Sequence, residues 1–229
     1  MFHWFRKFFT GNQLSTPVFD RRLVHDDARY IADALDSLGK IGFKFSPNVE
    51  ENLEGISSGI AAHWEGISFG REPDRGNWVH IALAGDPRPF QNALHLDDHC
   101  YDGATPSDYL QIVTEIIALA GDEWSVQNIE VKGQPSEPND QGQRLLVRIK
   151  ATPETPPFEL TTEKDFDWSI IFRLNERLPK EVQKRFAIFL DGDATIVFLT
   201  PGQIEELNSL CGYEFFYVDE FKGETMSDS

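Results

Sequence analysis

Cysteine is scarce in this chain, with only Cys100 and Cys211 among 229 residues. The two lie far apart in the sequence, and neither belongs to a C-x-x-C pair. The sequence therefore contains no disulfide framework and no cysteine-based zinc or redox motif. This usage favours a reducing compartment, and we expect a cytoplasmic protein.

Long apolar runs are also missing. The most apolar stretch at the start, MFHWFRKFF (1–9), is interrupted by Arg6 and Lys7. A signal peptide needs an uninterrupted apolar region, and a membrane-spanning helix needs about 20 apolar residues. We expect a protein that is neither exported nor inserted in a membrane, with residues 1–9 packed on its own body.

The usual signatures of nucleotide and serine-nucleophile chemistry are absent. The sequence has neither a Walker pattern nor G-x-G-x-x-G, and ISSGI (56–60) does not fit the G-x-S-x-G elbow. We therefore expect no nucleotide cofactor and, more generally, no cofactor.

Basic residues are few relative to acidic ones. The chain has 38 acidic and 21 basic side chains, a net charge of −17. Residues 1–60 hold 8 acidic and 7 basic residues, and 61–229 hold 30 and 14, so the excess follows residue 60 without forming an acidic tail. Such a charge repels nucleic acid and attracts basic proteins. Acidity for solubility alone is the alternative interpretation.

Hydrophobic residues make up 40% of the sequence, including 18 Phe, which is enough for a sizeable core. Apolar periodicity predicts helices over 25–38, 49–61 and 105–121, the last with Thr105 as N-cap. Strands are predicted over 64–70, 77–85 and 90–96 as a meander, and over 124–132 and 143–151 as a long hairpin.

Residues 151–165, rich in proline and threonine, suggest an internal boundary. It would divide an N-terminal α+β region (1–150) from a C-terminal α/β-like region (158–229), with both packed together as one globule. In the second region we expect strands at 167–175, 195–199 and 213–218 and helices at 179–190 and 201–210. The fold class predicted is α+β, with a mixed, largely antiparallel sheet.

The stretch ALHLDDHCYDG (93–103) is the densest group of metal-ligand side chains. His95, Asp97 and His99 would share one face of a strand, which makes them candidate metal ligands for a metal-dependent hydrolase. Asp102 is an alternative carboxylate ligand, and His63 or His80 could join from neighbouring strands. The competing interpretation is a half-buried strand whose Leu94 and Leu96 face the core.

Cys100 lies beside His99 but among three aspartates. Neighbouring negative charge disfavours a thiolate, so a cysteine nucleophile is not expected.

A second stretch, FLDGDATIVFL (189–199), resembles the D-x-D-G-T motif of the haloacid dehalogenase phosphatases through Asp191, Asp193 and Thr195. Ala194 replaces the glycine of that motif, and only about 35 residues follow, whereas the family needs a full domain there. We interpret 191–193 as a turn between a helix and a strand.

Together these features favour binding over catalysis. We expect an acidic cytoplasmic protein, an inhibitor or immunity-type protein, that caps a basic protein partner such as a toxin domain. The alternatives are the metal-dependent hydrolase and a DNA mimic. Neither nucleic acid nor membrane is an expected partner.

Overall fold

The computed structural model describes residues 21–47, 52–65, 75–85, 88–96, 105–134, 143–151, 158–162, 166–191 and 193–217. Residues 1–9, predicted above to pack on the body, lie outside these ranges. No helix among the described residues has the length and apolar character needed to cross a membrane.

The described residues form helices and two antiparallel sheets, which confirms the α+β class. The α-helices are α1 (Arg21–Ile41), α3 (Leu53–Glu65), α4 (Arg75–Leu83), α5 (Pro106–Ala118), α6 (Ile170–Asn175) and α7 (Pro201–Cys211), and η2 (Gly121–Glu123) is a 3₁₀ turn. The strands are β1 (Ala93–Leu96), β2 (Val126–Gln134), β3 (Gln143–Ala151), β4 (Phe158–Thr162), β5 (Arg185–Asp191) and β6 (Asp193–Leu199). The central sheet has the order β1-β6-β5, and the outer sheet has the order β2-β3-β4.

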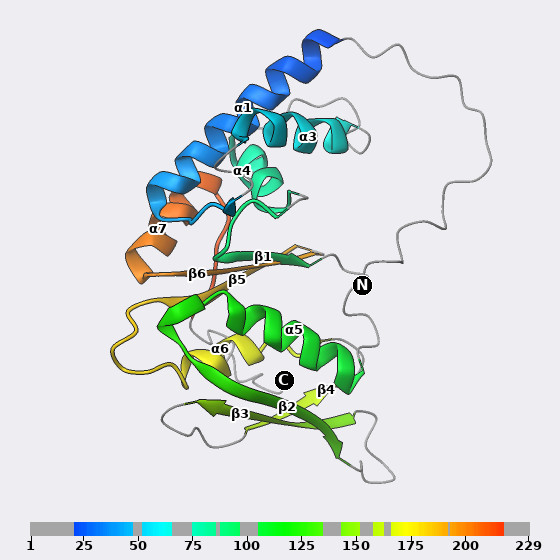
Figure 1. Ribbon diagram of the computed structural model, residues 1–229, viewed down its shortest axis with the longest axis vertical. Helices are drawn as coiled ribbons and strands as arrows, with labels where there is room; N and C mark the ends of the chain where they lie inside the picture. The colour runs from blue at the N-terminus through cyan, green and yellow to red at the C-terminus, as the bar shows by residue number, and fades with distance from the viewer. Residues whose placement is uncertain are drawn as a thin grey trace, which may run out of the picture.

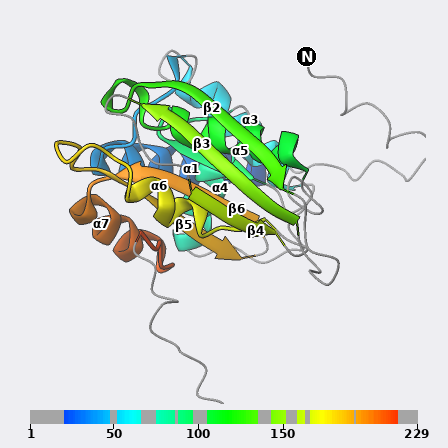
Figure 2. The same cartoon turned by 90° about the horizontal axis from the view of Figure 1, so that it is seen from below.

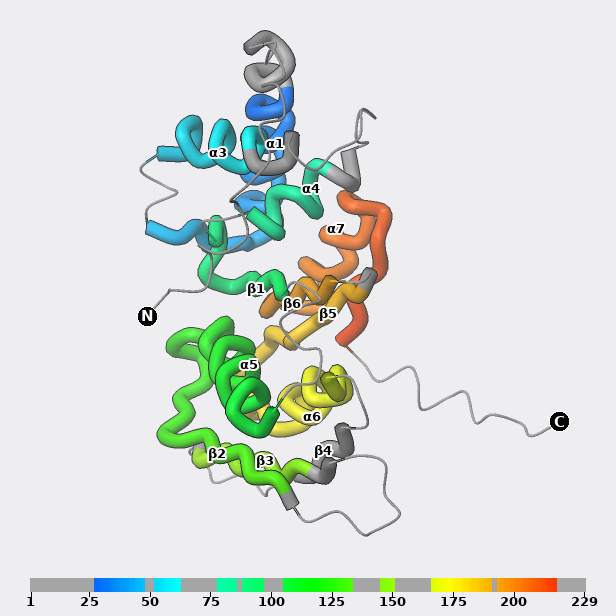
Figure 3. The backbone as a smooth tube through the Cα atoms, turned by 90° about the vertical axis from the view of Figure 1, so that its right-hand side faces the viewer, coloured from blue at the N-terminus to red at the C-terminus, as the bar shows by residue number. Residues whose placement is uncertain are grey.

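The elements are stacked in layers (Figure 1). Helices α1, α3, α4 and α7 lie on one side of the central sheet. Helices α5 and α6 lie on its other side, between the central and the outer sheet, as the tube view also shows (Figure 3). The central sheet joins chain segments from both halves of the sequence, because β1 pairs with β6.

Both faces of the central sheet are buried, each in its own hydrophobic cluster. On β6, Ile196 and Phe198 belong to the cluster shared with α5 and α6, whereas Val197 and Leu199 belong to the cluster shared with the four helices. This follows from the two-residue repeat of a strand. A run of apolar residues without polar interruption is what a strand covered on both faces requires.

Helices α5 and α7 begin in the same way. Thr105 and Thr200 are N-caps, each followed by proline and each closing a capping box, with Asp108 and Gln203 respectively. Helix α5 confirms the prediction over 105–121, and α7 confirms that over 201–210. Helix α7 ends at Gly212, whose φ of 71° is a left-handed conformation suited to glycine.

The predictions for the other segments had mixed outcomes. Helices α1 and α3 and strands β2, β3 and β6 are confirmed, and β1 confirms the end of the strand predicted over 90–96. The strand predicted over 64–70 is wrong at its start, because α3 continues to Glu65, and 66–70 lie outside the described residues.

The strand predicted over 77–85 is wrong, because these residues belong to helix α4. Val79, Ala82 and Leu83 are buried, and Gly85 lets the chain pass close to Ile60 of α3, since a Cβ at Gly85 would lie 2.5 Å from the Ile60 side chain. A short apolar run fits a buried strand or a buried helix equally well, so its period could not decide between them.

The strand predicted over 167–175 is also wrong. Asp167 accepts a hydrogen bond from the backbone N–H of Ser169 (3.0 Å), and helix α6 follows. Its buried residues Ile170, Ile171 and Leu174 follow helical spacing.

The helix predicted over 179–190 is a turn followed by strand β5, so 191–193 joins two strands and not a helix and a strand. The strand predicted over 213–218 is reduced, within the described residues, to one bridge between Phe216 and Ile188.

A buried asparagine just before β1 forms hydrogen bonds with the segment after α1 and with β6. Asn92 is 3% exposed; its Oδ1 accepts from the Lys44 N–H (2.8 Å), and its Nδ2 donates to the carbonyls of Gly42 (3.3 Å) and Phe198 (3.4 Å). The backbone carbonyl of Asn92 accepts from the Phe198 N–H (3.0 Å). One side chain therefore ties the segment after α1 to the central sheet.

Candidate functional site

His95, the first of the predicted metal ligands, lies on β1 directly opposite Thr195 of β6. Its Nδ1 shares a hydrogen bond of 3.0 Å with Thr195 Oγ1. Its Nε2 lies 3.6 Å from Asp193 Oδ2, close enough for an ion pair when the imidazole is protonated. Residues two apart on a strand face the same side, which is why Asp193 and Thr195 both reach the same ring.

A second histidine reaches this group from helix α4. The His80 ring meets the His95 ring edge-on, with centroids 5.8 Å apart. It also meets Phe189 and Tyr213 edge-on, each at 5.9 Å, while those two rings stack on one another at 4.8 Å. His80 had been considered as a ligand from a neighbouring strand; the structure brings it to His95, but from a helix.

The remaining members of the predicted metal set cannot be placed. Asp97, His99 and Asp102 lie outside the described residues, as does Cys100, and the side chain of His63 is likewise not described. Within the part of the chain that the structure describes, no three His, Cys, Asp or Glu side chains are grouped so as to hold a metal ion.

Two residues that contact His95 belong to the sequence motif at 189–199. Asp193 and Thr195 were noted for their resemblance to the phosphatase motif, and the structure instead joins them to His95. The link depends on strand pairing between residues 100 positions apart, and no local pattern carries that information.

The order Thr195, His95, Asp193 resembles that of a nucleophile, a base and an orienting carboxylate. Thr195, however, is 0% exposed, and its hydroxyl sits in the interior of the central sheet. A substrate has no route to that oxygen in this structure. The contact with His95 gives the buried Thr195 hydroxyl a hydrogen-bond partner, as folded proteins require.

Cys211 offers no alternative nucleophile. It is 5% exposed, at the end of α7, and burial raises the pKa of its thiol. Because the thiolate is the reactive form, a raised pKa lowers reactivity.

An exposed tyrosine and a half-buried tryptophan stack on each other between α1 and α4. Tyr30 is 43% exposed and stacks on Trp78, with ring centroids 5.5 Å apart and planes 20° apart. The Arg29 guanidinium lies 5.4 Å from the Tyr30 ring centroid. Asp27 and Asp33 stand three residues before and after Tyr30 on the helix, so the aromatic pair has acidic neighbours on the same face.

Charge is unevenly divided between the described residues and the stretches that connect them. The described residues include 20 acidic and 16 basic side chains, whereas the other residues include 18 acidic and 5 basic. Along the sequence, the acidic excess falls after residue 60. Most of it belongs to stretches that lie between or beyond the described elements.

No protein-family model, curated protein or solved structure matches this chain.

Proposed function

We propose that this chain is an acidic binding protein that caps a basic protein partner, such as a toxin domain, in a reducing cytoplasm. The observation that carries the proposal is the exposed Tyr30 of α1, which stacks on the half-buried Trp78 of α4 and has Asp27 and Asp33 beside it on the helix. Binding hot spots in protein interfaces usually consist of aromatic anchor residues surrounded by a polar rim.

The net charge of −17 supports the same kind of partner. A field of this sign speeds the encounter with a basic surface and disfavours phosphate backbones. The stretch between β1 and α5 adds Asp97, Asp98 and Asp102, and the stretch between β2 and β3 adds Glu137 and Asp140. These acidic residues belong to the sequence between described elements, and they add negative charge that would complement a basic partner.

Binding also agrees with the chemistry of the described residues better than catalysis does. The hydroxyl that bonds His95, that of Thr195, is buried, and so is the thiol of Cys211. Both groups are placed where they stabilise the fold.

The test uses affinity capture from cells, followed by kinetics with the purified basic partner. We expect the association rate to fall at least about tenfold as salt rises from about 0.05 to about 0.5 M, with little change in dissociation. Replacing the anchor, Tyr30→Ala, should speed dissociation about tenfold.

The matched control is Leu190→Ala, since Leu190 is also 43% exposed but lies on β5. It should leave both rates unchanged. An association rate indifferent to salt, or equal effects of the two substitutions, would contradict the proposal and leave the acidity as a device for solubility.

A further inference from the structure

The outer sheet has one covered face and one open face. Leu145, Val147 and Ile149 of β3 point inward and are buried in the cluster shared with α5 and α6. Seen from below, β2 and β3 run across the front of the molecule with no helix over them (Figure 2). Among the side chains that alternate with the buried ones, Asn128, Lys132, Arg148 and Lys150 are exposed, whereas Glu130 and Leu146 are half-buried.

These outward side chains are mostly cationic. Among the outward side chains of β2 and β3 that the structure describes, Lys132, Arg148 and Lys150 are exposed, and Glu130 is the one acidic residue. Strand register places Glu130 opposite Arg148, and Lys150 opposite Asn128. We call Lys132, Arg148, Lys150 and Glu130 the basic face; it has three positive charges and one negative charge in a chain of net charge −17.

The pKa of Glu130 reflects the positive charges around it. Its Oε1 lies 2.8 Å from Lys132 Nζ. The hydrogen bond from Lys132 is the main cause that holds the pKa of Glu130 below its ordinary value, and the charges of Lys132, Arg148 and Lys150 act in the same direction. Three cations converge on one carboxylate, so two positive charges remain without an acidic counterpart in this group.

We propose that the basic face docks an extended acidic segment of a partner protein. Outward residues on one strand recur every two positions, about 7 Å, and so do alternate side chains of an extended peptide. Carboxylates on alternate residues of the partner would therefore meet Arg148 and Lys150 in turn. This site lies on a different layer from the Tyr30–Trp78 pair, and it does not depend on the function proposed above.

A peptide suits the basic face better than a nucleic acid does. Recognition of single strands on a sheet uses aromatic side chains on which bases stack. The outward residues of β2 and β3 that the structure describes are Asn128, Glu130, Lys132, Leu146, Arg148 and Lys150, and none of these is aromatic. The overall charge adds repulsion over any longer phosphate backbone.

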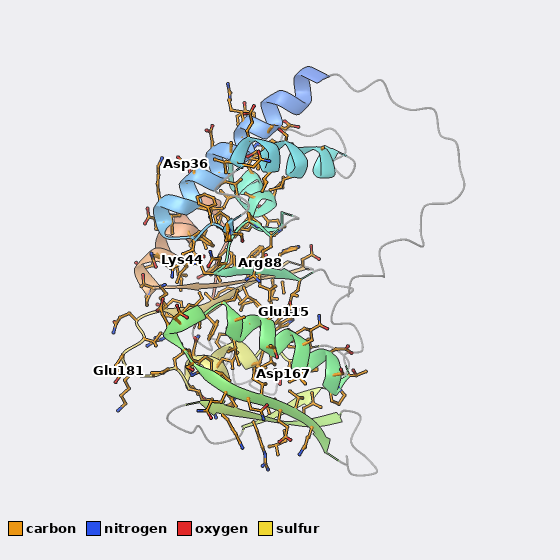
Figure 4. All side chains as sticks on the ribbon, in the orientation of Figure 1. Asp36, Lys44, Arg88, Glu115, Asp167 and Glu181 are labelled. Atoms are coloured by element: carbon orange, nitrogen blue, oxygen red, sulfur yellow. The ribbon has the colours of Figure 1, made fainter. Side chains whose placement is uncertain are left out.

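The experiment measures fluorescence anisotropy of a labelled peptide of about ten residues, with glutamate at alternate positions, against the full chain. The test variant is K132Q/R148Q/K150Q. The control is K40Q/K44Q/K180Q, which removes the same number of charges from exposed lysines elsewhere. Figure 4 shows Lys44 near the central sheet, far from the outer sheet.

We expect the test variant to lose about tenfold in peptide affinity, as three exposed charge contacts would supply, and the control to lose less than about twofold. Thermal unfolding and circular dichroism of both variants report whether each is folded. If the test variant does not fold, the single substitutions R148Q and K150Q are compared with K44Q and K180Q in the same assay, and each should lose about twofold.

Three results would overturn the proposal. The first is equal loss in the two triple variants, which would mean that only overall charge matters. The second is tighter binding of a labelled single-stranded oligonucleotide than of the peptide. The third is peptide binding that appears only when Asp219, Glu220, Glu224 and Asp228 are replaced by their amides, which would assign the basic face to the chain's own C-terminal residues.

Discussion

The two sheets of this protein have the same number of strands and the same antiparallel pairing, yet opposite surroundings. The central sheet is buried on both faces: from Ala194 to Leu199, β6 has no residue more than 1% exposed. The outer sheet is buried on one face and carries charged side chains on the other. The difference shows that strand pairing alone does not determine the pattern of apolar and polar residues along a strand. The number of covered faces determines that pattern.

The largest expected effect lies in the central sheet. Phe198→Ala should lower the free energy of unfolding by about 3–5 kcal/mol, because it leaves a cavity beside Phe186 in the cluster shared with α5 and α6. Leu199→Ala, on the opposite face, should cost about 2–5 kcal/mol. Urea denaturation measures both.

The matched substitution in the outer sheet is Arg148→Ala, at an exposed outward position. It should change stability by no more than about 0.5 kcal/mol. A cost below about 1 kcal/mol for Phe198→Ala would refute double-sided burial of the central sheet.

The next effect concerns two neighbouring amides at the entry to β1. Asn92→Ala should cost about 1–3 kcal/mol, because it removes an amide that is 3% exposed, its bond to the Lys44 N–H and its buried bond to the Phe198 carbonyl. Gln91→Ala is the control: Gln91 Nε2 also donates to a backbone carbonyl, that of Phe45 (2.8 Å), but in an exposed position. Thermal unfolding should separate the two variants clearly, and similar costs would mean that burial is not the deciding factor.

A smaller effect is expected from the polar pair inside the central sheet. Thr195→Val keeps the shape of the side chain but removes the hydroxyl that bonds His95, and should cost about 1 kcal/mol. Thr114→Val serves as comparison, since the Thr114 hydroxyl donates to the Leu110 carbonyl on the exposed side of α5. Urea midpoints that are equal for the two variants would show that the His95 contact adds no stability.

The smallest effect is a titration in the outer sheet. The pKa of Glu130 lies below its ordinary value because of Lys132 and its cationic neighbours, so the ionised carboxylate stabilises the fold. That contribution is present above the unfolded-state pKa and is lost as the pH falls through the folded-state pKa. Side-chain carboxyl NMR of K132Q/R148Q/K150Q should show the Glu130 pKa raised toward its ordinary value; an unchanged pKa would contradict the basic face.

The same contrast explains which parts of the fold could be predicted from the sequence. Strands β2 and β3 were predicted because one covered face produces alternating residues, and α5 because its cap and apolar stripe are both local. Strand β5 was predicted as a helix and α6 as a strand, since continuous apolar runs such as FAIFL and SIIF carry no decisive period. Residues 186–188 and 170–171 are all buried, so no polar residue among them shows the repeat.

The candidate site was predictable only in part, for a related reason. His95 could be selected by its residue type and by the strand around it. Its contacts with Asp193, Thr195 and His80 depend on which strand lies beside β1 and which helix covers it. Which strand and which helix lie beside β1 depends on the topology of the whole chain, which cannot be predicted from a single sequence.

The pairing of β1 with β6 also has a consequence for synthesis on the ribosome. His95 and Thr195 face each other across 100 residues of chain. At about 5–20 residues per second, β1 therefore waits about 5–20 s after it is made before its partner strand exists. Until then the apolar faces of α1, α3 and α4 have no sheet to cover them. We expect the nascent chain to need a holding chaperone during that interval, and chains that stall before residue 193 to be taken by proteases.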